Sequence, residues 1–350
     1  MRIVAGLSGG VDSSVAAWLL KRDGYDVVGV FMNNWDEKDE TDVCTAQQDW
    51  DDVQRVCDVI GIPCYSVNFS REYWDNVFTV FLEEYKRGRT PNPDVLCNRE
   101  IKFKAFLDYS QTLMADRMAT GHFVRTNEQG DLLKGTDPAK DQSYFLYMLK
   151  SHQLLKSCFP VGGMTKSEVR DLARSIGLPV SEKKDSTGIC FIGERNFRRF
   201  LAGYLPAQPG NIVTPQGDIV GRHQGLMYYT IGQRRGLGIG GRGDGRRFFV
   251  IDKDLKANRL IVVQGEDDER LYRSECLCDQ VTFIRQPLPD DTAVRLKAKT
   301  RYRQPDQECT AVYRDGLLEL RFDTPQRAIT PGQSAVLYDG DVCLGGGIIC

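Results

Sequence analysis

The first seventy residues alternate short apolar runs with amphipathic stretches. Ile3 to Leu7 form an apolar run that predicts a buried strand, and the stretch from Ser13 onward predicts a helix. Apolar runs at Asp26 to Met32 and at Pro63 to Phe69 predict two more strands, separated by an amphipathic helix over Gln47 to Ile60. Strands that alternate with helices are typical of parallel sheets with crossover helices, so we predict a doubly wound α/β sheet.

The segments that follow predict more helices and one more strand. These are helices over Arg71 to Arg87, Arg99 to Met114 and Thr165 to Leu178, and a strand over Arg117 to His122. The last helix is predicted to start with a capping box, Thr165-Lys-Ser-Glu168. Prolines on both sides of Asn92 make the connection before the second helix stiff, and we predict that this connection is not helical. A charged tip at Lys140 is predicted to lead into an aromatic helix that reaches Tyr147.

Beyond about Leu205 the sequence becomes β-rich. Short strand-like pieces separated by Gly, Asn and Asp predict a small β-rich domain, and the run from Glu266 to Glu269 predicts a linker. From Cys276 to Cys350, strand patterns separated by turn residues predict a β-barrel. We therefore expect an α/β domain over residues 1–204, a small β-rich domain over 205–269 and a C-terminal β-barrel over 270–350.

Length and composition agree with several domains. A chain of 350 residues is too long for one compact core, and 41% hydrophobic with 27% charged residues is ordinary for a soluble protein. No apolar run approaches the roughly 20 residues of a membrane span, and the chain does not begin with a basic segment followed by an apolar stretch. We expect a cytoplasmic protein without a membrane partner.

Cysteine, histidine and charge usage narrow the chemistry. The chain has 11 cysteines without a CxxC pair and only 3 histidines, so we expect neither a metal site nor a disulfide framework. Basic clusters such as Arg234-Arg235 and Arg301-Tyr302-Arg303 lie in the second half, whereas Asp36 to Asp58 is acidic. Each basic cluster is either ordinary solvated surface or part of a merged nucleic-acid face.

The most informative loop is Ser8-Gly-Gly-Val-Asp-Ser13, at the predicted junction of the first strand and helix. Its two glycines let backbone approach a phosphate, its hydroxyls can donate to phosphate oxygens, and the helix N-terminus favours anions. No lysine follows the glycines, so it is not the GxxxxGK[ST] nucleotide loop. Asp12 would repel a phosphate unless a metal intervened, which suits pyrophosphate with Mg²⁺. The alternative is an ordinary turn that contains glycine.

Cys97 and Cys190 stand in unusual surroundings. Cys97 follows the stiff loop and precedes a basic helix, where positive charge and the helix dipole favour a thiolate, so it is either a reactive or a packed thiol. Asp94, in the same loop, could orient a substrate or exchange a proton. Cys190 has apolar neighbours typical of an inert thiol, but the turn-rich stretch before it makes a mobile loop plausible.

Three further candidates lie at the expected carboxyl ends of strands, where ligands of α/β sheets bind. Met32 is either a ligand contact or a core residue. Gly121 could let a nucleotide ring pass close to the backbone. His122 is either a general base or a structural histidine.

Five motifs occur in order along the chain. They are Ser8-Gly-Gly-Val-Asp-Ser13, Thr90-Pro-Asn-Pro-Asp-Val-Leu-Cys-Asn-Arg-Glu-Ile-Lys-Phe103, Lys140-Asp-Gln-Ser-Tyr-Phe-Leu146, Asp185-Ser-Thr-Gly-Ile-Cys-Phe-Ile-Gly193 and Pro331-Gly-Gln333. Together they resemble the tRNA-specific 2-thiouridylases, enzymes of the N-type ATP pyrophosphatase (PP-loop) superfamily, over essentially the whole chain. The first motif alone is also similar to argininosuccinate synthases, GMP synthetases and other tRNA thiolases, whereas the two cysteine motifs are far more selective.

The resemblance implies roles for individual residues. ATP, with accompanying Mg²⁺, would be bound by Gly6, Leu7, Ser8, Gly9, Gly10, Val11, Asp12, Ser13, Met32 and Gly121. The target base, in the anticodon region of tRNA, would be contacted by Asn92, Pro93 and Asp94. Other tRNA contacts would be His122, Lys140, Asp141, Gln142, Arg301, Tyr302 and Gln333. One departure is Asn33, where we expect lysine in many relatives, and it puts one contact near the nucleotide in doubt.

The resemblance also implies a reaction, the 2-thiolation of the wobble uridine of tRNA by a tRNA-uridine 2-sulfurtransferase. The uridine 2-oxygen would attack the α-phosphate of ATP and release pyrophosphate. Sulfur from a persulfide on Cys190 would then replace the activated oxygen, and Cys97 would be the nucleophile that leaves a Cys97–Cys190 disulfide for a reductant. The sulfur would come from a persulfide donor such as a cysteine desulfurase or a sulfur-relay protein.

Two other classes of function remain as alternatives at this stage. A sulfur-independent enzyme that adenylates a small molecule would need neither reactive cysteine and no extended basic surface. A nonenzymatic tRNA-binding module would not need the glycine loop. Substitution of both cysteines by serine separates the first alternative from thiolation, because only a thiolating enzyme would lose activity.

Overall fold

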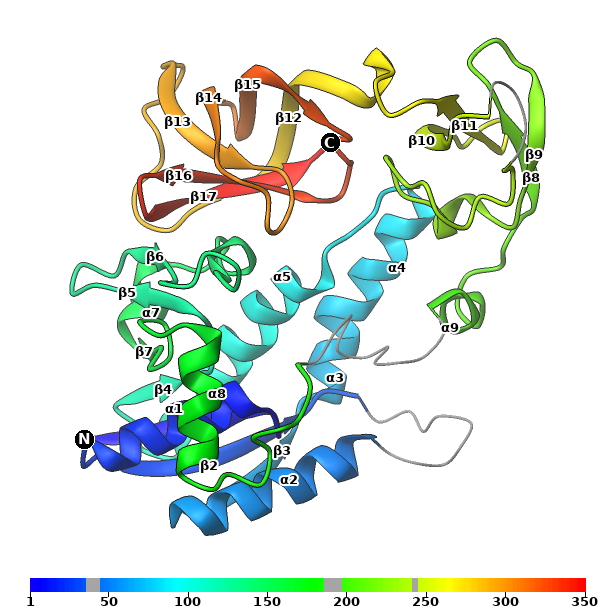
Figure 1. Ribbon diagram of the computed structural model, residues 1–350. Helices are drawn as coiled ribbons and strands as arrows, with labels where there is room; N and C mark the ends of the chain where they lie inside the picture. The colour runs from blue at the N-terminus through cyan, green and yellow to red at the C-terminus, as the bar shows by residue number, and fades with distance from the viewer. Residues whose placement is uncertain (36–44, 186–196, 241–244) are drawn as a thin grey trace.

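The computed structural model describes residues 1–35, 45–185, 197–240 and 245–350 (Figure 1). Its first sheet has five parallel strands in the order β3-β2-β1-β4-β7. These are β1 (Arg2–Leu7), β2 (Asp26–Asn33), β3 (Cys64–Asn68), β4 (Arg117–Ala119) and β7 (Ser157–Cys158). The strand order reverses between β1 and β4, which confirms the predicted doubly wound sheet. Ligands of such sheets bind at this reversal, beyond the carboxyl ends of the strands.

Helices cover both faces of this sheet. On β1, Ile3 and Leu7 point into the core beneath α1, α2 and α8, whereas Val4 points into the core beneath the helices from α3 to α6. The first group is α1 (Val11–Arg22), α2 (Thr45–Ile60) and α8 (Lys166–Ser175). The second group is α3 (Ser70–Tyr73), η1 (Trp74–Phe78), α4 (Thr79–Lys86), α5 (Pro93–Cys97), η2 (Asn98–Ala105) and α6 (Phe106–Thr112). Alternation of side chains along a buried strand thus produces two cores.

Two predictions for this region were wrong in detail. The connection around Asn92 is helical from Pro93 onward, because the fixed φ of proline suits the first position of a helix and its missing N–H would be unpaired there anyway. The predicted aromatic helix up to Tyr147 is only a 3₁₀ turn, η3 (Ser143–Phe145). It stays short because the carboxylate of Asp141 accepts the backbone N–H of Ser143 and fixes a tight turn. The remaining short helices are α7 (Ser151–Leu155) and α9 (Phe197–Ala202).

The second sheet is the central sheet, with four strands in the order β10-β11-β8-β9. Its elements are β8 (Gly210–Val213), β9 (Ile219–His223), η4 (Leu226–Tyr228), β10 (Phe248–Asp254) and β11 (Arg259–Gln264). Only the β11–β8 pair is parallel. Ile212, Val250 and Val262 are fully buried in a small core of its own. The predicted linker that follows ends in one 3₁₀ turn, η5 (Glu269–Leu271).

The third sheet is a closed six-stranded barrel, as predicted for the C-terminal part. Its strands follow the order β12-β15-β14-β13-β16-β17, and β17 pairs with β12 to close it. They are β12 (Tyr272–Phe283), β13 (Val294–Lys299), β14 (Gln307–Arg314), β15 (Leu317–Arg327), β16 (Ser334–Asp339) and β17 (Val342–Ile349). A hairpin from the first part of the chain, β5 (Val124–Thr126) and β6 (Leu132–Lys134), joins this sheet through β6–β17 pairing.

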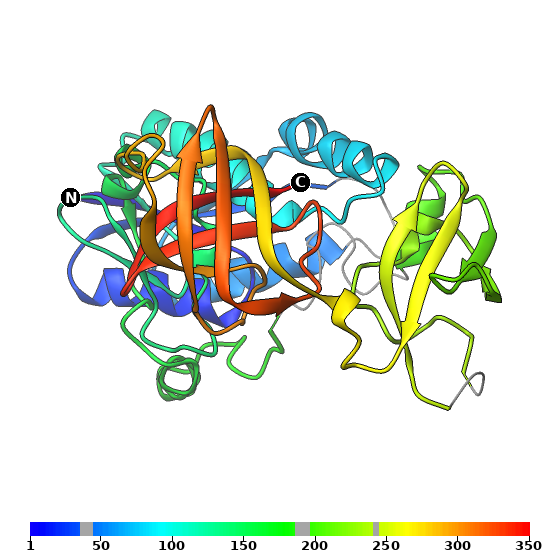
Figure 2. The same cartoon turned by 90° about the horizontal axis from the view of Figure 1, so that it is seen from above.

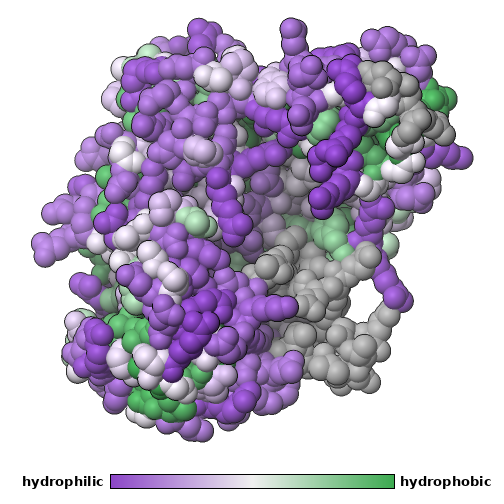
Figure 3. Space-filling view, viewed as in Figure 1, coloured by the Kyte–Doolittle hydropathy of each residue, from purple (hydrophilic) through white to green (hydrophobic). Residues whose placement is uncertain are grey.

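The barrel therefore lies directly on the α/β part, and the central sheet lies to one side, as the view from above shows (Figure 2). Hydrophilic side chains predominate on the face seen in Figure 3. Within the described parts of the chain, no helix is long and apolar enough to cross a membrane.

Candidate active site

The glycine loop runs from β1 straight into α1. The helix begins at Val11, earlier than predicted, so that Asp12 and Ser13 belong to its first turn. The Ser13 hydroxyl accepts the backbone N–H of Ser8 at 3.2 Å, and the Ser14 hydroxyl donates to the Gly10 carbonyl at 2.7 Å. These bonds hold the loop in shape while the first N–H groups of α1 face it, which is the arrangement that binds anions.

Two glycines allow other elements to touch this loop. Gly9 has φ of +69°, and a Cβ on it would lie 2.8 Å from the carbonyl oxygen of Asp49 in α2. A Cβ on Gly121, after β4, would lie 2.6 Å from the backbone nitrogen of Ser13. Side chains are excluded at both places, because contacts that short do not occur. Gly121 and the glycine loop therefore meet at the reversal of strand order.

Met32 and Gly6 also lie at this edge. A Cβ on Gly6 would approach the Met32 methyl group to 3.2 Å and the Phe106 ring to 3.1 Å. Met32 is only partly buried, near the end of β2. The structure thus gathers the residues for which we predict nucleotide contacts into one place, and their binding of ATP stays a prediction.

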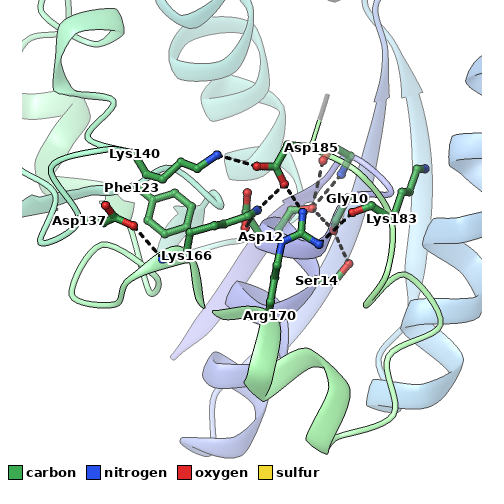
Figure 4. Close-up of polar contacts among 12 residues, drawn as sticks. Gly10, Asp12, Ser14, Phe123, Asp137, Lys140, Lys166, Arg170, Lys183 and Asp185 are labelled. Carbon is green, nitrogen blue, oxygen red and sulfur yellow. Dashed lines mark hydrogen bonds and ion pairs between the residues drawn. The ribbon is translucent and has the colours of Figure 1, made fainter. Parts of the chain in front are cut away.

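An ionic network borders the loop (Figure 4). Lys166, the first residue of α8, places its Nζ 2.6 Å from Oδ1 of Asp12 and 2.8 Å from Oδ1 of Asp185. Asp185 also pairs with Lys140 and with Arg170, each at 2.6 Å. One carboxylate is thus shared by three cations beside the glycine loop.

The pKa values of the two carboxyl groups in this network move in opposite directions. Burial raises the pKa of Asp12, and the neighbouring Lys166 only partly offsets this effect. Burial also acts on Asp185, but hydrogen bonds from Lys140 and Lys166 outweigh it and hold the pKa of that carboxyl well below its usual range. Asp185 is therefore firmly ionised, whereas Asp12 is the carboxylate whose charge is poorly compensated.

A second ion pair network lies next to it. Lys183 contacts Asp49 at 2.7 Å and Asp52 at 2.6 Å, both on α2. Burial lowers the pKa of the Lys183 ammonium, but its bonds to the two carboxylates outweigh that effect and raise it. The same helix supplies the Asp49 carbonyl that packs on Gly9, so Lys183 ties the segment before Asp185 to the wall of the loop.

Sequence reasoning missed Lys166, Arg170 and Lys183. One pattern could have found the first two: Thr165-Lys-Ser-Glu-Val-Arg170 places lysine and arginine four apart on one face, just inside the predicted capping box. The structure confirms that box, since Thr165 accepts the backbone N–H of Glu168 and the Glu168 carboxylate accepts that of Thr165. The sequence of α8 alone does not show that this helix faces the glycine loop.

Cys97 lies on the other side of the sheet in a continuous helix. It is the fifth residue of α5 and is only 2% exposed, so the prediction that it stands at the entrance of a helix was wrong. The helix dipole acts mainly in the first turn, which weakens that part of the argument for a thiolate. The prediction that Cys97 is the nucleophile stays untested. Cys190 and its surroundings lie outside the described residues.

Asp94 lies in the first turn of the same helix. Burial raises its pKa, and the positive charge of Lys102 partly offsets the rise. A carboxyl group with a raised pKa is better able to exchange a proton near neutral pH, which agrees with one of the two roles predicted for it.

His122 is almost fully buried beside the glycine loop. Its Nδ1 lies 2.8 Å from the Thr120 hydroxyl, and its ring lies 5.7 Å from that of Phe103. Burial, helped by the charge of Lys102, holds its pKa well below the usual value, so the imidazole is neutral at physiological pH. A neutral ring could accept a proton only at a high cost, which favours the structural alternative.

The Lys140-Asp141-Gln142 segment was predicted to be an exposed tip, which was wrong, because Asp141 is buried and its two neighbours are partly buried. Asp141 is 6% exposed and accepts the backbone N–H groups of Gly135 and Ser143, each at 3.1 Å. Gln142 accepts the Phe123 N–H at 2.9 Å. These contacts give both residues a structural role, and their predicted contact with tRNA stays a prediction.

Arg301, Tyr302 and Gln333 lie where the barrel, the central domain and the connection between α4 and α5 come together. Arg301 Nη2 donates to the Ala328 carbonyl at 2.8 Å and to the Ile231 carbonyl at 3.2 Å. The Gln333 amide donates to the Thr90 carbonyl at 2.7 Å, and Tyr302 packs on Phe145 with ring centroids 4.4 Å apart. A pocket of about 410 Å³ opens here, lined by Thr90, Thr230, Ile231, Gly232, Gln233, Arg301, Thr330 and Gln333.

This junction fixes the segment for which we predict contact with the target base. The Thr90 N–H donates to the Pro331 carbonyl at 2.9 Å, in addition to the bond from Gln333. The barrel therefore holds the residue two positions before Asn92. Among the residues that the structure covers, no cluster of histidine, cysteine or acidic side chains has the form of a metal site.

Comparison with known proteins agrees with this architecture. Residues 1–194 match the model of the tRNA methyl transferase HUP domain, residues 198–264 that of the tRNA methyl transferase PRC-barrel domain, and residues 273–349 that of the aminomethyltransferase β-barrel domain. The fold and the loop thus define a class of three-domain proteins with an N-terminal HUP domain.

Relatives identify the family within this class. The tRNA-specific 2-thiouridylase MnmA of Listeria welshimeri is 58% identical over 100% of this chain and 94% of its own. That of Alkaliphilus oremlandii is 56% identical over 99% of this chain and 96% of its own. The chain belongs to the tRNA-specific 2-thiouridylase (MnmA) family. Among solved structures, a 4-thiouridine synthetase in complex with RNA and bound ATP aligns with 16% identity and a TM-score of 0.35, over 59% of this chain and 50% of that chain.

Proposed function

We propose that this protein thiolates tRNA with ATP, as a tRNA-uridine 2-sulfurtransferase that converts the wobble uridine to 2-thiouridine. The observation that carries the proposal is the glycine loop at the reversal of strand order, where Gly9 and Gly121 pack against backbone so closely that neither position has room for a side chain. The printed names of the relatives, tRNA-specific 2-thiouridylases, support the choice of tRNA and sulfur.

The first step activates an unreactive carbonyl. The uridine 2-oxygen attacks the α-phosphate of ATP, forms a C–O–P bond and breaks the bond between the α- and β-phosphates, so that pyrophosphate leaves. Ser8, Ser13 and the N–H groups that begin α1 would hold the phosphates. Mg²⁺ commonly binds through one or two carboxylates together with phosphates, and the poorly compensated charge of Asp12 fits that role.

The second step replaces the activated oxygen by sulfur. The terminal sulfur of a persulfide on Cys190 attacks carbon 2 of the base, and AMP leaves with the former 2-oxygen. The Cys97 thiolate then attacks the Cys190 sulfur and breaks the sulfur–sulfur bond, which leaves the 2-thiocarbonyl and a Cys97–Cys190 disulfide. A dithiol reductant then reduces this disulfide and is itself oxidised. A donor such as a cysteine desulfurase or a sulfur-relay protein supplies the next persulfide.

Asp94 would act on the target base, and the junction of the three domains would bind other parts of the tRNA. The raised pKa of Asp94 suits a group that takes the proton from N3 of uridine as the 2-oxygen attacks. Extrusion of the base from the anticodon stack costs a few kcal/mol, and contacts of the barrel and central sheet with tRNA would offset this cost. Exposed arginines of the central sheet, among them Arg235 and Arg247, supply positive charge for such contacts.

The test is nucleoside analysis of tRNA after incubation with the protein, ATP and a persulfide source. We expect 2-thiouridine together with AMP and pyrophosphate in equal amounts. Asp12→Ala and Gly9→Val should abolish pyrophosphate release while the circular dichroism spectrum is preserved. ADP and phosphate as products would overturn the adenylation step. Full activity of the double variant Cys97→Ser/Cys190→Ser would favour a sulfur-independent adenylating enzyme instead.

A further inference from the structure

Asp185 binds more positive charge than one carboxylate requires. Its Oδ2 lies 2.6 Å from Lys140, and its Oδ1 lies 2.8 Å from Lys166 and 2.6 Å from Arg170. Lys166 also contacts the Asp12 carboxylate, at 2.6 Å, so the three cations and the two carboxylates form one cluster. These side chains are only 11–31% exposed, and cations in such a place are stabilised further when a more highly charged anion binds.

Lys166 connects this cluster to the glycine loop. Its ammonium contacts Asp12, in the first turn of α1, at 2.6 Å, so an anion on the loop lies within reach of the same ammonium. Arg170 follows four residues later on the same face of α8. As Figure 4 shows, the two side chains extend from α8 toward Asp185 and the loop.

The position of Lys166 is also fixed in advance. Its backbone N–H donates to Asp137 Oδ2 at 3.0 Å, its ammonium lies 5.8 Å from the centre of the Phe123 ring, and the capping box at Thr165 holds the start of the helix. A cation held in this way loses little side-chain entropy on binding a ligand, which is typical of residues that bind and orient a substrate.

We propose that Lys166 and Arg170 form the second wall of the pyrophosphate site, opposite the glycine loop, and that Asp185 occupies that wall until the phosphates displace it. This inference rests on the proposed function and assigns these residues to the leaving pyrophosphate. A pyrophosphate group offers both cations several charged oxygens in place of the single Oδ1 that they now share. Asp185 keeps Lys140 as its partner on Oδ2 when it is displaced.

The proposal makes Asp185 a competitor of pyrophosphate, so removal of its charge should strengthen the binding of pyrophosphate. The probe is inorganic pyrophosphate, titrated into the full-length protein by calorimetry with and without Mg²⁺. Asp185→Asn should bind pyrophosphate several-fold more tightly than the unaltered protein. Lys166→Met and Arg170→Met should each bind it about tenfold more weakly, the size of a lost charge-assisted hydrogen bond. Affinity for AMP, which lacks these phosphates, should stay the same in all three.

Two substitutions on the outer side of α8 are the matched controls. Arg174 pairs with Asp171 at 3.0 Å and with Glu182 at 2.7 Å, away from the loop. Arg174→Met and Asp171→Asn change the net charge by the same amounts as the test variants, and both should leave pyrophosphate affinity unaltered.

The binding data test the assignment of Lys166 and Arg170, and the reaction products separately test the proposed adenylation. Unchanged or weaker binding of pyrophosphate to Asp185→Asn, or equal effects of Lys166→Met and Arg174→Met, would overturn the assignment of this wall. Release of AMP and pyrophosphate by the unaltered enzyme would still support adenylation in that case. Formation of ADP would instead contradict the proposed function, whatever the binding data show.

Discussion

The ammonium of Lys253, on β10 of the central sheet, donates a hydrogen bond of 2.9 Å to the carbonyl oxygen of Gly88. Gly88 follows α4 and opens the segment that leads to Asn92 and Cys97. The Leu255 side chain would lie 2.7 Å from a Cβ on Gly88, so the central sheet packs closely on this turn. Together with the contacts of Gln333 and Pro331 to Thr90, this bond holds the segment between two domains.

The Lys253 bond predicts a pH dependence of stability. Burial lowers the pKa of Lys253 to about 8, from an ordinary value of 10.5. Between these two values the folded protein holds fewer protons than the unfolded chain, so the free energy of unfolding should rise with pH across this window. Lys253→Met should remove that rise. Urea denaturation at a series of pH values measures it.

The exposed Lys256, three residues further along, provides the control for this measurement. Lys256→Met should retain the rise seen in the unaltered protein. An unaltered slope in Lys253→Met would mean that the Lys253 ammonium is not desolvated in solution.

Gly121→Ala should inactivate the enzyme without unfolding it. The new methyl group would lie 2.6 Å from the Ser13 nitrogen and 2.7 Å from the Asp12 carbonyl carbon, and backbone atoms cannot move aside cheaply. We expect the glycine loop to shift, pyrophosphate release to be lost, and stability to fall by about 1–3 kcal/mol, as for overpacked sites. Rates of pyrophosphate release and thermal unfolding measure the two effects.

Gly163→Ala is the matched control for Gly121→Ala. A Cβ on Gly163 meets nothing within 4 Å, and the backbone there is not in the left-handed region. Both readouts should stay unaltered in this variant. Normal pyrophosphate release by Gly121→Ala would show that the loop tolerates displacement and would remove the steric argument.

Local patterns in the sequence predicted much of the fold. The apolar run Ile3–Leu7, the capping box at Thr165 and the turn-rich C-terminal strands each gave the correct element because neighbours in sequence determine such features. The addition of the β5–β6 hairpin to the barrel was not predictable, because β6 has three residues and pairs with β17 more than two hundred positions away. The charge cluster around Asp185 was missed for the same reason, since its partners come from separate segments.

Asp141→Asn should chiefly reduce stability. Asp141 accepts three hydrogen bonds in the interior, and its carboxylate lies 3.5 Å from Lys299 of the barrel. The amide replaces one acceptor by a donor and removes the charge that faces Lys299, so we expect a loss of about 2–3 kcal/mol. Chemical denaturation measures the loss. The affinity of the folded protein for tRNA should change little.

The exposed pair of Asp341 and Arg125, 3.1 Å apart on neighbouring elements, is the control for this change. Asp341→Asn should cost less than about 1 kcal/mol, as for other surface pairs. If Asp141→Asn instead left stability intact and weakened tRNA binding, the contact with tRNA implied by the family motif would be the better account.

Binding of tRNA should weaken steeply with salt, and Arg301→Ala should reduce the slope by about one unit if its guanidinium neutralises a phosphate. Arg301 lines the pocket at the junction of the three domains, and burial there lowers its pKa. Arg295→Ala is the control, because Asp323 holds that guanidinium through two bonds of 2.8 and 2.7 Å on the barrel surface. Equal salt dependence of tRNA affinity for Arg301→Ala and the unaltered protein would mean that Arg301 contacts no phosphate and only links the Ile231 and Ala328 carbonyls.

The last prediction concerns the two cysteines. A persulfide donor must bring its sulfur to the accepting thiolate, and the 2% exposure of Cys97 closes that residue to a bulky donor. Sulfur should therefore be loaded on Cys190, and Cys97 should act afterwards on the sulfur–sulfur bond. Treatment with a persulfide donor should add about 32 Da to Cys97→Ser but not to Cys190→Ser, the mass of one sulfur atom.

Intact mass and peptide mapping distinguish this order from its alternatives. Both variants should still bind ATP and tRNA, because neither cysteine belongs to the Ser8–Ser13 motif or to the residues for which we predict tRNA contacts. Both should fail to form 2-thiouridine, since one lacks the carrier of sulfur and the other lacks the thiolate that releases it. Added sulfur on Cys97, or full thiolation by Cys190→Ser, would reverse or remove the assigned roles, even though membership of the family would stand.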